Sequence, residues 1–255
     1  MKFSNGCWLQ KEGCSCFAPA EVYFTRIEEK KVTICAPTAH IVTRGDTVVS
    51  TPSFELELQE ELPLDVKDRE DEISIASGSL TLVITKKNWS MTYYRNGEMI
   101  TRSAGRDLAL MKTDFRGFAY NETDAEETYM RQMLSLSVGE LVYGTGERFT
   151  PFVKNGQSID IWNADGGTST EQSYKNIPFF ITNTGYGVLV NHPEKVSIEV
   201  ATEMVTRTEF SVEGGYLDYF LINGPSMKEV LTRYTDLTGK PSLPAPWTFG
   251  LWLST

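Results

Sequence analysis

The segment IDIWNADGGTSTEQSYKN places an indole, a carboxamide and a carboxylate within four residues, as Trp162, Asn163 and Asp165. Two glycines and a run of three hydroxyl residues follow them. A carboxylate can accept two hydrogen bonds from hydroxyl groups, an indole offers a flat apolar face, and glycine lets the backbone approach a partner closely. The segment therefore has the side chains of a ligand-binding loop.

Each of these side chains also has a structural interpretation. Trp162 can anchor the loop in a core or an interface, and a rigid loop needs an anchor, so we favour that interpretation for Trp162. Asp165 can bond its own backbone in a turn. Asn163 fits a binding role and a structural role equally well.

Residues that could perform catalysis do not form a recognisable set elsewhere in the chain. His40 and His192 lie far apart, and neither has a serine or cysteine partner that the sequence indicates, which argues against a nucleophilic triad. Asp160 and Asp165 are close in sequence, but nothing supports an active pair. The residues alone therefore indicate neither a nucleophilic triad nor an active carboxylate pair.

The cysteines do not indicate a metal site. Cys7, Cys14, Cys16 and Cys35 gather near the N-terminus, and the Cys-Ser-Cys spacing is not that of a zinc site. Reduced thiols are the favoured interpretation.

The YGTGER stretch lacks the third glycine and the following helix of a phosphate-binding loop. Glu147 and Arg148 at its end are expected to form a structural ion pair or to bind backbone carbonyls. Phe149 is expected to pack.

The composition excludes several classes of partner. The chain has 255 residues and a formal net charge of -10, which argues against binding nucleic acid or an anionic membrane surface. No stretch is as long and apolar as a transmembrane helix, and the start MKFSNGCWLQKEG lacks the apolar centre of a signal peptide. We therefore expect a cytoplasmic protein.

Strand patterns dominate the sequence. Apolar and polar residues alternate in 53–59, 79–85 and 89–94, which predicts half-buried strands. Asn96-Gly97 predicts a tight hairpin because both residues tolerate positive φ, and the apolar run 185–192 suits a strand covered on both faces. Many short strands separated by turns predict an antiparallel β-sandwich. Further strands are expected at 196–201, 208–214 and 215–224.

One short helix is predicted near the C-terminal end. Ser226 and Glu229 have the spacing of a capping box, and Gly239 and Pro241 stop the helix. Apolar residues recur at helical spacing between these signals and are expected to form one core-facing stripe. They are Met227, Val230, Leu231, Tyr234 and Leu237.

The stretch KPSLPAPWTFGLWLST follows the helix. Its prolines stiffen an extended linker, and the apolar run WTFGLWLST is expected to be a buried strand. A buried strand needs neighbours for its backbone groups. We therefore expect this run to lead into another domain.

Three stretches occur in succession: GELVYGTGERFTPFVKNGQSIDIWNADGGTSTEQSYKNIPFFIT, GYGVLVNHPEKVSIEV and LPAPWTFGLWLST. Their succession resembles the N-terminal part of glycoside hydrolase family 31, most closely its α-xylosidase branch. The opening NGCWLQKEG is similar to the start of those enzymes. The resemblance covers nearly the whole chain, is densest over 138–255, and is specific only as a composite.

The resemblance implies an all-β architecture. Residues 1–240 would form an antiparallel β-sandwich of the galactose-mutarotase-like type, with a short C-terminal helix. Residues 241–255 would be the linker and the first strand of a (β/α)₈ catalytic barrel that this chain lacks. In such barrels the chemistry takes place on loops at the carboxyl ends of the strands.

The resemblance also implies a function. The complete enzyme would hydrolyse a terminal α-linked xyloside or glucoside with retention, through two carboxyl groups about 5–5.5 Å apart. The family supplies both from barrel strands, which would lie beyond Thr255, so this chain alone is predicted to be inactive. The aspartate matching Asp165 contacts sugar hydroxyls, and we favour that role for Asp165, with Trp162 and Asn163 nearby. No metal or organic cofactor is implied, and homo-oligomers are common among such enzymes.

The sequence leaves alternatives open. The chain could be a stand-alone carbohydrate-binding module or a structural domain without catalysis. The choice between xylose and glucose depends mostly on side chains of the absent barrel.

The sequence also departs from the family pattern near 58–64, where family members usually carry further strands. A sandwich without a strand exposes unpaired edges, so we expect a gene fragment or an imperfect gene model, and an aggregation-prone product. The charged stretch 59–72 is expected to be a solvated connection.

Overall fold

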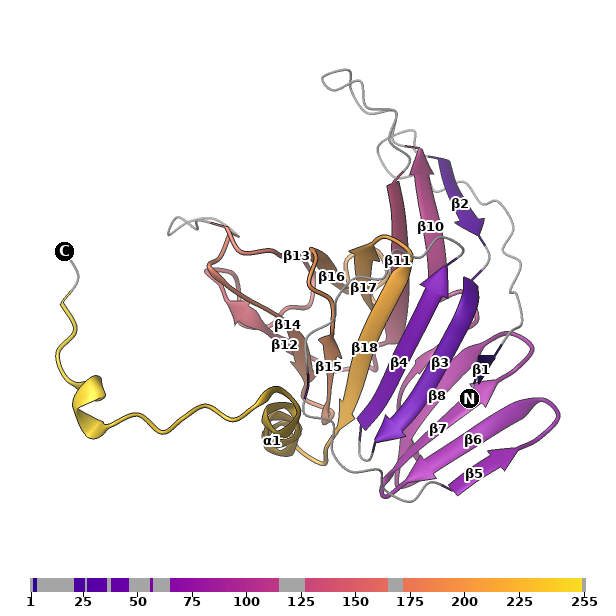
Figure 1. Cartoon of the computed structure of the whole chain (residues 1–255), viewed down its shortest axis with the longest axis horizontal. Helices are drawn as coiled ribbons and strands as arrows, with labels where there is room; N and C mark the ends of the chain where they lie inside the picture. Colours follow the sequence, from indigo (N-terminus) through magenta and orange to yellow (C-terminus); the bar gives the residue numbers. More distant parts are fainter. Residues whose placement is uncertain are drawn as a thin grey trace.

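The computed structural model describes residues 2–3, 21–25, 27–35, 38–45, 56, 65–114, 127–164 and 172–253. In this part of the chain the strands form three sheets, and every pair of named strands is antiparallel (Figure 1). The predicted antiparallel β-sandwich is confirmed.

The largest sheet has seven strands in the order β1-β3-β4-β18-β15-β14-β12. Its central strands β15 and β18 are buried along almost their whole length because both faces of the sheet are covered. The prediction for the apolar run 185–192 is therefore confirmed. The strands of this sheet are β1 (Lys2–Phe3), β3 (Ile27–Cys35), β4 (Thr38–Gly45), β12 (Val142–Glu147), β14 (Lys175–Thr182), β15 (Tyr186–Val190) and β18 (Tyr216–Asn223).

The second sheet has six strands in the order β13-β16-β17-β11-β10-β2 and faces the first across the main core. The strands expected at 196–201 and 208–214 are present as β16 and β17, which alternate between buried and half-buried residues up to the exposed last residue of β17. The strands are β2 (Glu21–Thr25), β10 (Leu108–Asp114), β11 (Glu127–Ser135), β13 (Gln157–Ile161), β16 (Val196–Val200) and β17 (Arg207–Glu213).

The third sheet has five strands in the order β5-β6-β7-β8-β9. Its β7 buries every second residue, and Trp89, Met91 and Tyr93 are all buried around β8, as predicted. Asn96 and Gly97 form the expected hairpin with φ of 50° and 86°. The strands are β5 (Asp65–Asp68), β6 (Glu72–Ser77), β7 (Leu80–Thr85), β8 (Ser90–Arg95) and β9 (Glu98–Ser103).

Part of the stretch 59–72 differs from the prediction of a simple solvated connection. Residues 65–68 are exposed, as expected, but they form the edge strand β5, which pairs with β6. Residues 59–64 lie outside the described residues, as does most of the strand expected at 53–59, of which Leu56 is half-buried beside the helix.

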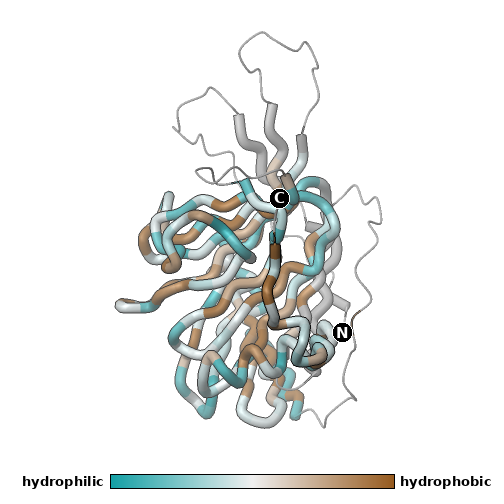
Figure 2. The backbone as a smooth tube through the Cα atoms, turned by 90° about the vertical axis from the view of Figure 1, so that its left-hand side faces the viewer, coloured by the Kyte–Doolittle hydropathy of each residue, from teal (hydrophilic) through white to brown (hydrophobic). Residues whose placement is uncertain are grey.

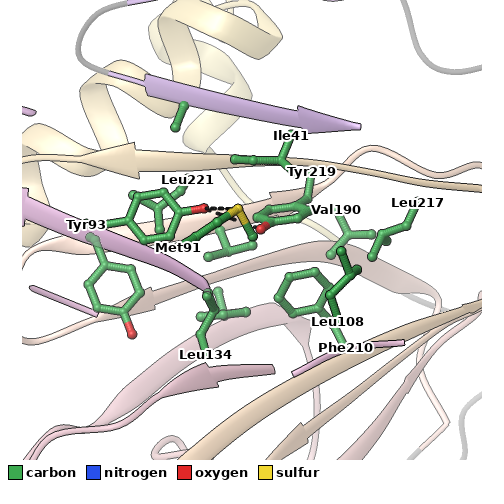
Figure 3. Close-up of a cluster of buried hydrophobic side chains, with 14 of the residues drawn as sticks. Ile41, Met91, Tyr93, Leu108, Leu134, Val190, Phe210, Leu217, Tyr219 and Leu221 are labelled. Atoms are coloured by element: carbon green, nitrogen blue, oxygen red, sulfur yellow. Dashed lines mark hydrogen bonds between the residues drawn. The ribbon is translucent and has the colours of Figure 1, made fainter. Parts of the chain in front are cut away.

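The three sheets meet around a buried polar contact (Figure 3). The Tyr93 hydroxyl lies 3.4 Å from the Tyr219 hydroxyl, and Tyr219 in turn donates to Gln132 Oε1 at 3.4 Å. These three residues come from β8, β18 and β11, one from each sheet. Burial raises the pKa of both tyrosines, so both hydroxyls stay protonated and can bridge the sheets within the apolar core.

Helix α1 (Met227–Thr238) covers the outer face of the seven-stranded sheet (Figure 1). Ser226 Oγ accepts a hydrogen bond from the backbone N–H of Glu229, and Gly239 follows the helix with a φ of 91°, so both predicted helix ends are confirmed. Val230 and Leu237 are buried, and Tyr234 stacks on Phe179 with ring centroids 4.1 Å apart.

The predicted apolar stripe of the helix is too wide by one residue. Leu231 is 46% exposed. It lies about 100° around the helix from Val230, and only one side of this helix contacts the sheet.

The segment after the helix is not the predicted buried strand. Residues 240–253 run away from the sheets, and Pro246–Phe249 form the short 3₁₀ helix η1 (Figure 1). In the view of Figure 2 this segment lies in front of the sheets, and parts of it have the brown colour of hydrophobic residues. Trp247 and Trp252 are each 81% exposed. A strand is stable only when a neighbour pairs with its backbone groups, and no strand of the described chain pairs with this segment.

The outward face of the six-stranded sheet carries a half-buried ion pair between Glu209 and Arg131. Glu209 of β17 lies directly opposite Glu199 of β16, and Glu209 Oε1 is 3.9 Å from Arg131 Nε. Burial raises the pKa of the Glu209 carboxyl from 4.5 to about 7, Arg131 opposes this shift, and Glu199 adds to it. At this carboxyl the folded chain therefore binds more protons than the unfolded chain between these values, so the contribution of Glu209 to stability falls as the pH rises from about 4.5 to about 7.

We expect Glu209→Gln to stabilise the chain by about 1–3 kcal/mol at pH 8 and to change little at pH 4.5. The amide removes a carboxylate that is costly to bury when it is charged. Melting temperatures between pH 4.5 and pH 8 measure the effect, with Glu213→Gln on the exposed end of β17 as the control. Parallel melting curves for Glu209→Gln and the unmodified chain at every pH would contradict the prediction.

Candidate functional site

The binding loop predicted from the sequence lies where the two larger sheets approach each other at one edge. It joins β13 of the six-stranded sheet to β14 of the seven-stranded sheet. An isolated bridge pairs Asn163 with Ser173, and Ala164 N donates to Ser173 O at 3.0 Å. The two ends of the loop therefore run side by side.

Strand β12 contains an unusual backbone next to this loop. Gly144, Thr145 and Gly146 have φ of 108°, 70° and 90°, and the pairing of β12 with β14 shifts register between Gly144 and Gly146. Thr145 is buried despite its left-handed conformation. A bulge of this kind changes the direction of the strand, and here it precedes Glu147 and Arg148.

Arg148 binds three groups at the base of the loop. Its Nη2 donates to Asp160 O at 2.6 Å and also to Asn176 Oδ1, while its Nε donates to Thr145 O at 3.2 Å. Burial lowers the pKa of the guanidinium, and Asp160 partly opposes this effect. The prediction that Arg148 binds backbone carbonyls is confirmed, and the structure pairs Glu147 with Lys175, 3.0 Å apart, at the surface.

Asn176 holds both ends of the loop through one carboxamide. Its Nδ2 lies 2.8 Å from Trp162 O, 2.7 Å from Ser173 O and 3.1 Å from Asn163 Oδ1. Ser173 Oγ also donates to Glu147 O. Sequence reasoning missed Asn176 and Ser173, because neither residue belongs to a periodic pattern or a recognised motif.

Trp162 has a fixed backbone and an exposed side chain. Its carbonyl accepts from Asn176, whereas the residue is 54% exposed. It lines two hollows of about 240 Å³ each. Trp162 is therefore not an anchor in the core of this chain, because the polar network holds its backbone and the residue is exposed. The other part of that interpretation, an anchor in an interface, stays a prediction.

Asn163 is exposed and also takes part in the network. Its Oδ1 accepts from the backbone N–H of Asn176 at 3.2 Å, so the structural role that the sequence left open is present. Asp165 and the glycines and hydroxyl residues that follow it lie outside the described residues. The binding role of Asp165 stays a prediction.

A third hollow, of about 630 Å³, is also lined by Arg148. Phe149 and Tyr174 line it and are 67% and 69% exposed. Phe152 nearby in the chain is 79% exposed. The expectation that Phe149 packs is therefore not met within this chain, and the edge of the sandwich presents aromatic surface beside the loop.

His192 is buried beside the Trp162 hollow, and its Nδ1 accepts from the backbone N–H of Glu194 at 3.2 Å. Burial lowers its pKa, which favours the neutral imidazole.

Asp160 forms an ion pair with Lys195, whose Nζ lies 2.6 Å from Asp160 Oδ2. Among the described residues, no group of three His, Cys, Asp or Glu side chains could hold a metal ion. Cys7, Cys14 and Cys16 lie outside the described residues.

In the described ranges, no helix is long and apolar enough to cross a membrane.

The chain matches a family model and several curated proteins. Residues 30–199 match the model of the glycosyl hydrolase 31 N-terminal galactose mutarotase-like domain. The chain is 40% identical over 284 residues to alpha-xylosidase XylQ of Lactiplantibacillus pentosus, covering 100% of this chain and 36% of that protein. It is 62% identical over 127 residues to an alpha-xylosidase of Emericella nidulans, covering 50% of this chain and 16% of that protein.

The fold agrees with a solved structure of the same family. A GH31 dextranase of Flavobacterium johnsoniae superposes with a TM-score of 0.73 at 20% identity, covering 95% of this chain and 30% of that chain. The chain thus spans about a third of the length of these two proteins, XylQ and the dextranase. The alignment with XylQ is also longer than the chain, so XylQ has residues that this chain lacks.

Proposed function

Because the chain belongs to glycoside hydrolase family 31, we propose that it is the N-terminal part of a retaining α-glycoside hydrolase acting on an α-linked xyloside or glucoside. Its specific contribution is the loop after β13, which forms part of the rim of the sugar pocket. The observation that supports this role best is the exposed Trp162 ring between two hollows, on a backbone held by Asn176.

The chemistry of the loop suits a sugar. Sugars combine apolar ring faces with hydroxyl groups, and an indole matches the former while carboxylate and carboxamide oxygens match the latter. Trp162, Asn163 and Asp165 supply these groups within four residues. In the proposal Asp165 accepts hydrogen bonds from sugar hydroxyls, Trp162 covers the ring, and Asn163 shapes the end of the loop.

The catalytic carboxyl groups of the proposed reaction belong to a (β/α)₈ barrel. Retaining hydrolysis needs a nucleophile and an acid/base about 5–5.5 Å apart, and the proposal assigns both to a barrel following residues 1–240. The exposed apolar residues of the C-terminal segment and the aromatic edge at Phe149 and Tyr174 support such a neighbour, because large exposed apolar surfaces mark interfaces. The exposed apolar residues in the segment are Leu243, Trp247, Phe249, Leu251, Trp252 and Leu253.

We expect the 255-residue chain to show no turnover of aryl α-xylosides. A chimera in which this chain replaces the matched segment of the Lactiplantibacillus pentosus relative should hydrolyse them. In that chimera Asp165→Ala should lower kcat/KM roughly 10–100-fold, the effect of losing charged hydrogen bonds to substrate. Glu171→Ala, which removes another carboxylate of the same loop, is the control.

Two results would count against this proposal. Turnover by the isolated chain that Asp165→Ala abolishes would move the catalytic site into the sandwich. Unchanged kinetics of the Asp165→Ala chimera, together with loss of assembly on truncation, would favour a purely structural domain.

A stand-alone carbohydrate-binding module is the second candidate, and the two hollows beside Trp162 favour it. Such a module should bind xylose or glucose without a barrel, which calorimetry or NMR shifts would detect. Part of a pocket offers few contacts to offset the cost of association, so we rank this candidate lower. A cytoplasmic location also stays a prediction, which fractionation of the native host would test.

A further inference from the structure

Polar contacts hold the two described ends of the loop that carries Trp162. The contacts converge on Asn176, which lies directly opposite Gly146 in the pairing of β12 with β14. We propose that Asn176 is a positioning residue, whose carboxamide fixes the two ends of the loop and so orients Trp162 and Asn163. This inference deepens the proposed function and rests on it for its relevance to sugar.

The orientation of the carboxamide is determined by its neighbours. Arg148 has only donors and faces Oδ1, while the carbonyls of Trp162 and Ser173 can only accept and face Nδ2. Each side of the carboxamide therefore meets the complementary partner. No other residue of this size offers an acceptor on one side and two donors on the other.

Arg148 fixes the position of Asn176. Arg148, which binds its Oδ1, also binds the carbonyls of Thr145 and Asp160, and these belong to β12 and β13. The bulge at Gly144 and Gly146 places Arg148 at this point. The contacts therefore run from strands β12 and β13 through Arg148 to Asn176, and from Asn176 to both ends of the loop.

The consequence for function is preorganisation. A side chain that binds a ligand from a fixed backbone loses less conformational entropy than one on a free loop. Because the Trp162 carbonyl is bound to Asn176, the backbone that sets the direction of the indole is fixed before any sugar arrives. We infer that Asn176 acts on sugar binding only through this loop.

Asn176→Asp tests the proposal, because it keeps the size of the side chain and its contact with Arg148. The new carboxylate has no donor for the two carbonyls and repels them. Asn183→Asp is a matched control at the opposite end of β14, where Asn183 accepts from Leu141 N at 2.9 Å and donates to Gly139 O at 3.1 Å. Both variants introduce the same charge and remove the same donor from the same pair of strands.

Hydrogen exchange of the full chain is the main measurement. Asn176→Asp should raise amide exchange in 162–174 roughly tenfold, with the rest of the molecule unchanged. Asn183→Asp should affect 139–142 and leave the loop as it was. The indole N–H signal of Trp162, assigned with Trp162→Phe, should shift only in Asn176→Asp.

The proposal is overturned if Asn176→Asp leaves loop exchange unchanged, or if exchange rises across the whole chain together with a lower melting temperature. Kinetics of the same variants in the chimera distinguish the positioning role of Asn176 from the proposed place of the loop in the sugar pocket. A lower kcat/KM for Asn176→Asp but not for Asn183→Asp supports both. Faster loop exchange with unchanged kcat/KM upholds the positioning role and removes the loop from the proposed sugar pocket.

Discussion

Replacing Gly146 with alanine is expected to lower the free energy of unfolding by about 3–5 kcal/mol. A Cβ at this position would lie 2.0 Å from Lys175 O and 3.0 Å from Ile177 N, both of which are backbone atoms of β14. Backbone atoms cannot rotate away as a side chain can, so β12 and β14 must separate. Alanine at a φ of 90° adds conformational strain to this clash.

Gly156→Ala is the matched control for this experiment. Gly156 has a φ of 82°, and an added Cβ there meets nothing within 4 Å. It should cost about 1–2 kcal/mol from backbone strain alone. Urea unfolding followed by circular dichroism gives both values, provided that the slope of free energy against urea stays constant. Equal losses in the two variants would show that the close approach of β12 and β14 contributes nothing.

Local periodicity predicted the strands well because burial follows it directly. The alternation in 79–85 and 89–94 became β7 and β8 with the expected residues inside, since a strand sends successive side chains to opposite faces. Ser226 correctly predicted the start of helix α1, and Asn96-Gly97 correctly predicted a hairpin. Preferences for helix caps and tight turns depend only on the backbone within a few residues.

Contacts between segments far apart in the chain could not be predicted from local sequence patterns. The grouping of strands into three sheets depends on pairings such as β4 with β18, whose residues are far apart in the chain. The contact between Tyr93 and Tyr219 likewise joins residues 126 positions apart in the chain, and neither residue stands out from other strand aromatics. The C-terminal run was predicted as a strand from composition alone, yet a strand also needs a partner.

At the candidate site, too, local features could be predicted from the sequence and contacts between distant segments could not. The sequence identified the loop by its unusual side chains, and it allowed that Arg148 binds backbone carbonyls, which the structure confirms. It did not identify Asn176, because one asparagine after a polar stretch has no pattern of its own. The role of Asn176 depends on the bulge in β12, and a bulge is a feature of two paired strands rather than of one segment.

Arg95 also joins the five-stranded sheet to the seven-stranded sheet. Arg95, the last residue of β8, has three backbone carbonyls as acceptors: Gly185 O at 2.9 Å, Gly224 O at 2.6 Å and Thr184 O at 2.8 Å. These carbonyls lie in the turn between β14 and β15 and just before helix α1. We expect Arg95→Ala to lower the free energy of unfolding by about 3 kcal/mol or more, because hydrogen bonds from a charged donor are strong and the carbonyls lose their partner.

Arg95→Lys distinguishes the geometry of the guanidinium from its charge. An ammonium group is a single point donor and cannot reach three carbonyls that the planar guanidinium spans, so lysine should recover less than half of the loss. Arg102→Ala on the exposed side of β9 is the control, and it should change stability by no more than about 0.5 kcal/mol. Urea unfolding midpoints give the comparison. Full recovery by lysine would mean that positive charge alone stabilises this junction, whereas partial recovery means that the two sheets are joined by directed hydrogen bonds.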